Sequence, residues 1–223
     1  RTDPAASDWV PVSTQSEQPD RSDLAETNRL EAFSDGVFAI AITLLVLELH
    51  APELEEGQRL WPALLDEWPQ FAAYLASFAI LGIMWINHHS MFRQIQRADR
   101  GLMFLNLLLL LWVTLLPFPT SLFAEHLEDD NGHVAGAVYS ATLTLAAIAF
   151  SLIWWYVLRH HLVEHDMSKA EIRKSLIRYS VGTVIYGATI GISFVSAQLT
   201  LAIVFLLALY YGFEQVRTRG GSS

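Results

Sequence analysis

Asp35 is the residue of this sequence that most needs a chemical explanation, because it lies well inside the largely apolar run Leu30–Leu49. A run of about 20 apolar residues crosses a bilayer as a helix, and an ionisable residue inside such a helix is costly. Two kinds of chemistry would justify that cost. The carboxylate could belong to a hydrogen-bonded network between helices, or it could handle a proton or a cation.

Partners for Asp35 are found at matching depth in two neighbouring apolar runs. The second run, Trp68–His88, ends in Trp85, Asn87, His88 and His89, and the third carries Asn106 in its second turn. We expect these side chains to form one polar cluster together with Ser34 and Asp35. The alternatives for the cluster are a structural network and a proton relay or ion site. Adjacent histidines point about 100° apart on a helix and chelate one ion poorly, so we expect no metal to be bound by this pair.

The first run also carries an apolar stripe. At 100° per residue, one face of this helix collects Phe33, Gly36, Val37, Ile40, Thr43, Leu44 and Leu47. Asp35 lies about 140° from Ile40 on the same wheel. If the stripe lines an aqueous path, Asp35 faces another helix instead and needs a partner there. The alternative is that the stripe is ordinary helix packing.

Six apolar runs must position these residues, since 52% of the chain is hydrophobic and the hydrophobic residues occur in blocks. We predict an all-α membrane domain over residues 28–216. A disordered cytoplasmic tail precedes it at 1–27, and a second cytoplasmic tail, or a cloning remnant, follows at 217–223. The predicted membrane helices are Leu30–Leu49, Trp68–His88, Leu102–Phe123, Val134–Leu158, Tyr179–Ser196 and Leu199–Val216. Ser168 and Glu171 resemble a capping box, so we expect the fifth helix to begin with a cytoplasmic extension.

The basic residues predict the orientation of these helices. Of the 14 lysines and arginines, 13 fall in the termini and in the second and fourth loops, and the opposite loops hold only Arg59. The positive-inside rule places the richer side in the cytoplasm, with both termini. The outer loops are acidic. This charge could serve to concentrate cations there, or it could simply follow from the exclusion of basic residues from outer loops.

Several classes of protein are excluded. The net charge of −9 argues against a nucleic-acid partner, and the absence of cysteine removes disulfides and thiolate metal sites. No phosphate-binding glycine loop and no nucleophile with a base is present, so we expect neither an enzyme nor a cofactor. The usual potassium filter sequence is missing, and the tight turn near Ala197 leaves no room for a re-entrant loop.

The string from Arg29 through Phe33-Ser34-Asp35 to Gly-Val-Phe-Ala-Ile-Ala-Ile-Thr-Leu-Leu resembles the signature of the transmembrane protein 175 family. The ending Trp85…His88-His89 of the second run is also similar to that family. The resemblance extends over about residues 28–216 and is to the single-repeat prokaryotic members.

The resemblance implies a potassium-permeable homotetramer in a prokaryotic plasma membrane, with a pore lined by the first helix of each subunit. It implies a constriction at Ile40, with further layers at Leu44 and Leu47 and with Thr43, Gly36 and Val37 lining the path. It also implies an inner polar network of Arg29, Phe33, Ser34, Asp35, Trp85 and His88 or His89, to which the depth of Asn106 in the third run adds that residue.

We therefore interpret the sequence as a potassium-over-sodium channel that discriminates by partial dehydration at apolar rings. The competing hypothesis is a secondary transporter of cations or protons that uses Asp35 and the histidines of the second helix.

Overall fold

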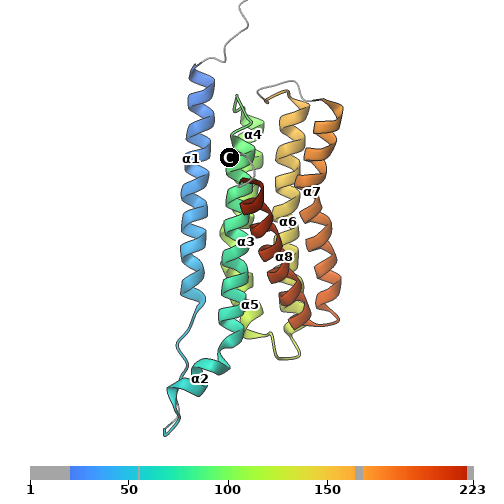
Figure 1. The fold of residues 1–223 in the computed structure, drawn as a ribbon. Coiled ribbons are helices and arrows are strands. Elements are labelled where there is room, and N and C mark those ends of the chain that lie inside the picture. The colour runs from blue at the N-terminus through green and yellow to red at the C-terminus, as the bar shows by residue number, and fades with distance from the viewer. Residues whose placement is uncertain (1–20, 55, 164–167, 220–223) are drawn as a thin grey trace, which may run out of the picture.

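The computed structural model describes residues 21–54, 56–163 and 168–219, and every element in those ranges is helical (Figure 1). The first helix, α1 (Arg21–Leu44), continues into the 3₁₀ turn η1 (Leu45–Glu48). The short α2 (Leu60–Asp66) follows, and it is directly succeeded by the long α3 (Trp68–Phe92). The remaining elements are α4 (Arg100–Leu115), α5 (Pro117–Glu125), α6 (Gly132–Arg159), α7 (Lys169–Ser193) and α8 (Ala197–Arg219).

Four helical segments are long and apolar enough to cross a membrane: Leu24–Glu48, Trp68–Phe92, Arg100–Glu125 and Gly132–Arg159. They coincide with the first four predicted runs. Among the described residues α7 does not reach this measure: it opens with four charged residues, and its remaining part is rich in serine, threonine, glycine and tyrosine. The apolar part of α8, Ala197–Tyr210, is shorter than the other four.

The first helix begins earlier than the sequence predicted. Residues 21–27 were assigned to a disordered tail, yet they form the first two turns of α1, and residues 1–20 lie outside the described part of the chain. No glycine or proline interrupts the stretch from Arg21 to Asp35, and Leu24 and Ala25 favour a helix. At the other end, α8 continues through residues 217–219, which were also assigned to a tail.

Prolines divide the third predicted run. The structure has two helices, with α4 ending at Leu115 and α5 starting at Pro117, which lacks the N–H needed to continue the helical ladder. The predicted capping box is confirmed, because the Ser168 hydroxyl accepts a bond from the Glu171 N–H and the Glu171 carboxylate accepts one from the Ser168 N–H. These bonds to the carboxylate lower the pKa of Glu171 below its usual value.

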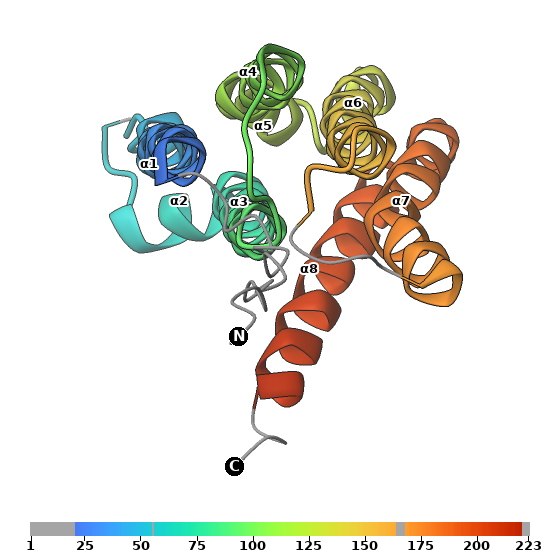
Figure 2. The same ribbon diagram turned by 90° about the horizontal axis from the view of Figure 1, so that it is seen from above.

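The helices form a bundle in which α1 stands at the edge. Viewed from above, α1 lies beside α3 and α4, while α6 and α7 pack together on the far side and α8 crosses beneath them toward α3 (Figure 2). We call the end with the starts of α1, α4 and α7 the basic end, and the other the acidic end. The core between the helices is apolar, and its largest side chains include Trp154, Tyr139, Phe38 and Phe92.

Contacts at the basic end join the loops after α3 and α6. The N–H of Gln96 donates to the carbonyl of Leu162 at 2.9 Å. Asp99 caps α4 by accepting from the Leu102 N–H, and its other oxygen accepts from the hydroxyl of Tyr156 on α6. That hydroxyl passes so near Gly101 that an added Cβ would lie 2.1 Å from it, which explains the glycine. These contacts fix the α3–α4 connection, and with it the end of α3 that carries the histidines.

Candidate functional site

The α1–α3–α4 interface holds a buried chain of hydrogen bonds. Asn106 Nδ2 on α4 donates to Ser34 Oγ on α1 at 2.8 Å, and Ser34 in turn donates to the Leu30 carbonyl at 2.8 Å. On its other side, Asn106 Oδ1 is 2.9 Å from His88 Nε2. All three side chains are buried, so one asparagine satisfies polar groups from two other helices.

The bond to Asn106 determines the tautomer of His88. An amide oxygen only accepts, so His88 Nε2 carries the proton and Nδ1 is left as an acceptor. Within the described residues, Nδ1 is buried without a hydrogen-bond partner. The ring lies among Phe38, Phe92 and Phe150, with centroid distances of 5.4, 4.2 and 6.3 Å. His88 therefore occupies an aromatic pocket and bonds through one nitrogen only.

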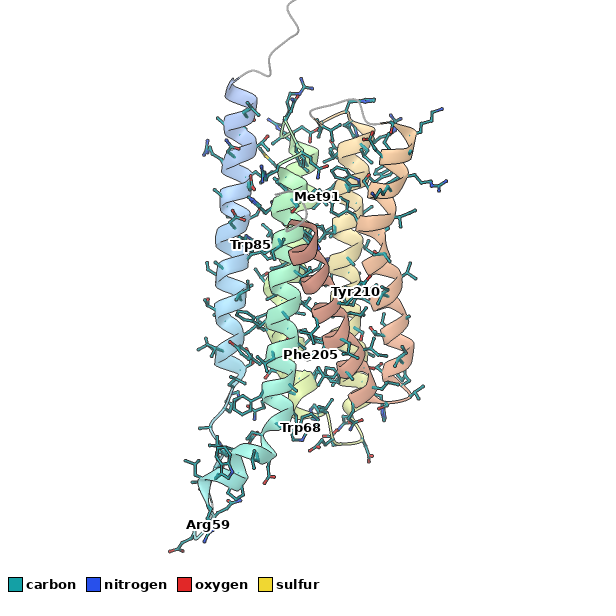
Figure 3. The ribbon with its side chains drawn as sticks, viewed as in Figure 1. Arg59, Trp68, Trp85, Met91, Phe205 and Tyr210 are labelled. Atoms are coloured by element: carbon teal, nitrogen blue, oxygen red, sulfur yellow. The ribbon has the colours of Figure 1, made fainter. Side chains whose placement is uncertain are left out.

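A second pair of contacts lies beside this chain, nearer the surface of the bundle. The Trp85 indole N–H donates to Asp35 Oδ1 at 2.9 Å, and one turn further on His89 Nδ1 lies 2.7 Å from Glu31 Oε1. The helices run antiparallel, so a step of four residues on each moves from the first contact to the second. Figure 3 labels Trp85 between α1 and α3, where this seam runs.

The apolar stripe of α1 faces away from these contacts. The exposed fractions of Phe33, Ile40 and Leu47 are 53%, 59% and 66%, whereas Phe38, Ala41 and Leu45 on the opposite face are fully buried. Gly36, Thr43 and Leu44 are also exposed, and Val37 is partly buried. Thr43 donates its hydroxyl to the Ile40 carbonyl at 2.9 Å. The helix thus presents one face to its own bundle and leaves the other uncovered in the single chain.

Comparison with known proteins identifies the family. A family model described as the endosomal/lysosomal potassium channel TMEM175 matches residues 29–117. A potassium channel of Streptomyces collinus is 50% identical over 193 residues, which are 86% of this chain and 94% of that protein. A potassium channel of Chamaesiphon minutus is 40% identical over 201 residues, 89% and 98% of the two chains.

The chain belongs to the TMEM175 family. Its fold agrees with the crystal structure of a lysosomal potassium-selective channel TMEM175 homolog from Chamaesiphon minutus, with a TM-score of 0.76 and 39% sequence identity over 85% of this chain and 98% of that one. The resemblance seen in the string Arg29–Leu45 is therefore confirmed. These relatives are channels, which agrees with the expectation that the chain is not an enzyme.

Not every residue of the expected TMEM175 network joins it within this chain. Arg29 and Phe33 are exposed, and no hydrogen bond or ion pair links Arg29 to the cluster among the described residues. The two residues are one turn apart and continue the uncovered stripe that contains Ile40. Arg29 and Phe33 do not join the cluster because their face of α1 points away from α3.

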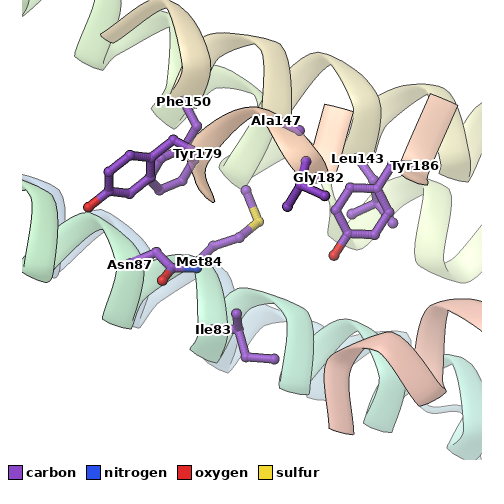
Figure 4. Close-up of a pocket in the computed structure, with 10 residues that line it drawn as sticks. Ile83, Met84, Asn87, Leu143, Ala147, Phe150, Tyr179, Gly182 and Tyr186 are labelled. Carbon is purple, nitrogen blue, oxygen red and sulfur yellow. The ribbon is translucent and has the colours of Figure 1, made fainter. Parts of the chain in front are cut away.

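Asn87 is also absent from the cluster, although the sequence placed it there. It lines a pocket of about 80 Å³ between α3, α6 and α7, on the side of α3 remote from α1 (Figure 4). The other lining groups are mainly apolar and include Ile83, Met84, Phe150 and Gly182. The reason is the helix period, which turns Asn87 about 100° from His88.

Glu31 is the member of the cluster that sequence reasoning missed. The signal was available, since Glu31 lies four residues before Asp35 and His89 four residues after Trp85. Residues four apart share a helix face, so two contacting antiparallel helices match such pairs. The open choice between His88 and His89 also has a plain answer: each bonds to α1, His88 through Asn106 to Ser34, and His89 directly to Glu31.

Proposed function

We propose that this chain is one subunit of a homotetrameric, potassium-permeable channel in the plasma membrane of a prokaryote, with the exposed face of α1 lining the pore. The observation that carries the proposal is the uncovered stripe of α1 in a chain that is 50% identical to a potassium channel over 86% of its length. In a closed symmetric oligomer, copies of one helix face can meet about the symmetry axis, and the proposal places this face of α1 there.

Stacked apolar rings would form where four copies of α1 surround an axis. Ile40 and Leu44 lie one turn apart on α1, and Leu47 follows on η1, so the three span about 12 Å at 1.5 Å per residue in α1 and 2.0 Å per residue in η1. An ion that passes such a ring loses hydration water without gaining full replacement ligands, and this cost is smaller for potassium than for the more strongly hydrated sodium. Thr43 adds the one hydroxyl oxygen on this stretch of the stripe, where it could offer a lone pair to a partly dehydrated ion.

Six membrane crossings and cytoplasmic termini complete the proposal. The 25 residues of α7 extend about 38 Å at 1.5 Å per residue, enough for a span whose charged first turns stay outside the hydrocarbon. α8 returns after the short connection that follows Ser193. The basic end then lies in the cytoplasm and the acidic end outside, in agreement with the distribution of lysine and arginine.

The hydrogen-bond chain favours a channel over a proton-coupled transporter. The hydrogen bonds run from His88 through Asn106 to Ser34. The middle group is an amide, which neither releases nor takes up a proton near neutral pH. A relay from the histidine toward α1 is therefore interrupted at Asn106. The chain suits a structural link that holds α1 against the bundle.

Reconstitution tests the proposal. The purified protein is placed in a planar bilayer with potassium on one side and sodium on the other, and the reversal potential of single-channel currents is measured. We expect unitary currents that follow the membrane potential without a coupled ion and reverse nearer the potassium equilibrium potential, and a tetramer in native mass spectrometry. Flux that depends on a proton gradient, or a protein that stays monomeric while conducting, would overturn it.

A further inference from the structure

Three side chains that could ligate a metal meet at the seam between α1 and α3. Glu31 and Asp35 offer a carboxylate oxygen each, and His89 offers a ring nitrogen, and the three ligand atoms lie within 4.8 Å of one another. All three residues are partly exposed, so an ion has access from solvent. Two carboxylates and one imidazole are a donor set that suits zinc and similar divalent transition metals.

We propose that Glu31, Asp35 and His89 bind one divalent transition-metal ion per subunit, of the Zn²⁺ class, and that the bound ion clamps α1 to α3. The ligands come from two helices: Glu31 and Asp35 from one face of α1, and His89 from the last turn of α3. An ion held by all three cross-links these helices at the basic end. The two carboxylate charges balance the charge of the ion.

The site needs little rearrangement to accept a metal. Ligand atoms around a tetrahedral zinc ion lie about 3.3 Å apart, given bonds of about 2.0 to 2.2 Å. His89 Nδ1 and Glu31 Oε1, now 2.7 Å apart, would have to separate slightly, and the Asp35 carboxylate would have to approach by rotation of its side chain. Water completes the coordination, as is usual where a protein supplies three ligands.

Contacts outside the cluster hold two of the ligands in place. The Trp85 N–H bonds to Asp35 Oδ1 and leaves the second oxygen of that carboxylate for the ion. The Trp85 ring also stacks on the His89 ring, with centroids 6.3 Å apart and planes inclined by 26°. Such outer contacts orient metal ligands, and their loss typically weakens binding about 10- to 100-fold.

The consequence for conduction rests on the proposed function, because it requires α1 to line the pore. In this proposal a pore made of four α1 helices widens by movement of each α1 relative to its own bundle. A metal bridge to α3 opposes that movement. Metal ions that reach the site from the basic side should therefore reduce the channel current. Metal binding itself does not depend on the pore assignment and is measured separately.

Binding is tested on the purified full chain in detergent. Equilibrium dialysis with Zn²⁺, and with Co²⁺ for its visible absorption, should show one saturable site per subunit, with no comparable site for Mg²⁺. Glu31→Gln and His89→Gln keep similar shapes but remove ligands, and each should weaken binding by at least roughly 100-fold. Glu26→Gln on the same helix and His133→Gln on α6, both at exposed positions, are matched controls that should bind as the original chain does.

Current recording then tests the clamp. Zn²⁺ added from the basic side should reduce the current of the original chain and of Glu26→Gln, and leave that of Glu31→Gln unchanged. Absent or unsaturable binding, or equal binding by Glu31→Gln and the original chain, would refute the site. Binding without any change of current would refute the clamp alone, and a chain that binds Zn²⁺ yet never conducts would refute the proposed function while the metal site stands. Should Glu31→Gln fail to fold, His89→Gln decides the same questions.

Discussion

Trp85 on α3 donates its indole N–H to Asp35 on α1, with 2.9 Å between Nε1 and Oδ1. This contact gives the aspartate in the middle of α1 a partner on the face turned about 140° from Ile40. The carboxylate is thereby directed into the helix interface, and away from the stripe that we assign to the pore.

Asp35→Ala should therefore reduce the stability of the folded oligomer. The indole N–H loses its acceptor, and the expected loss is about 1 to 2 kcal/mol per subunit, since hydrogen bonds to charged groups exceed the average of about 0.6 kcal/mol in membranes. Size-exclusion chromatography after heating at graded temperatures measures the loss. Trp85→Phe should lower the midpoint similarly, whereas Trp155→Phe, at an exposed position on α6, should not. An intact oligomer with altered ion selectivity would contradict the structural role of Asp35.

Asn106→Ala should be more damaging than Asp35→Ala, because Asn106 serves two buried groups. His88 Nε2 loses its partner, and Ser34 Oγ loses the bond it accepts while it keeps the one it donates to the Leu30 carbonyl. A buried donor left without a partner costs about 1 to 3 kcal/mol and the second lost hydrogen bond about 1 kcal/mol, so the expected total is about 2 to 4 kcal/mol per subunit. Thermal denaturation in detergent checks this. Asn131→Ala, at an exposed position before α6, is the control, and equal midpoints for the two variants would argue against the network.

The sequence predicted these helices and their faces well, but it did not predict their register. The helix period placed Asp35 on another face than the stripe, and hence at an interface if the stripe lines an aqueous path, and Ser168 and Glu171 identified a helix start from local chemistry. Pairings such as Glu31 with His89 depend on how far α3 slides along α1, and that is set by packing across the whole interface. Asn87 is an example: it was expected in the cluster, but it is turned about 100° from its neighbour His88 and faces α6 and α7 instead.

Some helix boundaries could be predicted from the sequence and others could not. The split between α4 and α5 follows from Pro117, a signal that was visible in the sequence and was outweighed by the apolar run around it. The short α2 has no comparable signal, since its seven residues include Pro62 and lie between an acidic loop and the start of α3. The start of α1 at Arg21 was missed because a polar composition was taken as evidence of disorder, although Leu24 and Ala25 favour a helix.

Topology can be tested without background labelling, because the chain contains no cysteine. A cysteine at Glu56, in the loop between η1 and α2, should react with an impermeant thiol reagent added to intact cells. A cysteine at Ser168, before α7, should react only after lysis, since the flanking loop is rich in basic residues. The opposite pattern would reverse the proposed orientation.

The connection between α5 and α6 should respond to pH through His126. Its ring lies 2.7 Å from the Asp129 carboxylate, and this bond raises the pKa of His126 above the usual 6.5. The folded chain thus binds this proton more tightly than the unfolded chain does. The resulting stabilisation is present below about pH 6.5 and is lost as the pH rises through the folded pKa.

Nuclear magnetic resonance of labelled histidine, assigned with His126→Gln, gives the titration of this ring directly. Asp129→Asn should move the pKa of His126 back toward 6.5, and Asp130→Asn, one residue further along the loop, should leave it raised. An unchanged titration in Asp129→Asn would show that the pair does not form in the folded protein.

Ile40→Asn tests the pore directly. The side chain is 59% exposed in the single chain, and the proposal places four copies of it at the narrowest apolar ring. An amide at this layer offers oxygen ligands to a dehydrated ion and lowers the barrier for sodium as well as for potassium. Conductance should therefore rise, and under opposed potassium and sodium gradients the reversal potential should move toward zero by several millivolts or more.

Ile42→Asn is the matched control, because Ile42 is partly buried against the subunit's own core. It should cost stability, as a polar group in an apolar core does, while the surviving channels keep the original reversal potential. If the stripe were only a packing surface, Ile40→Asn would behave like Ile42→Asn, with fewer channels and an unshifted reversal potential, and α1 would not be the pore helix.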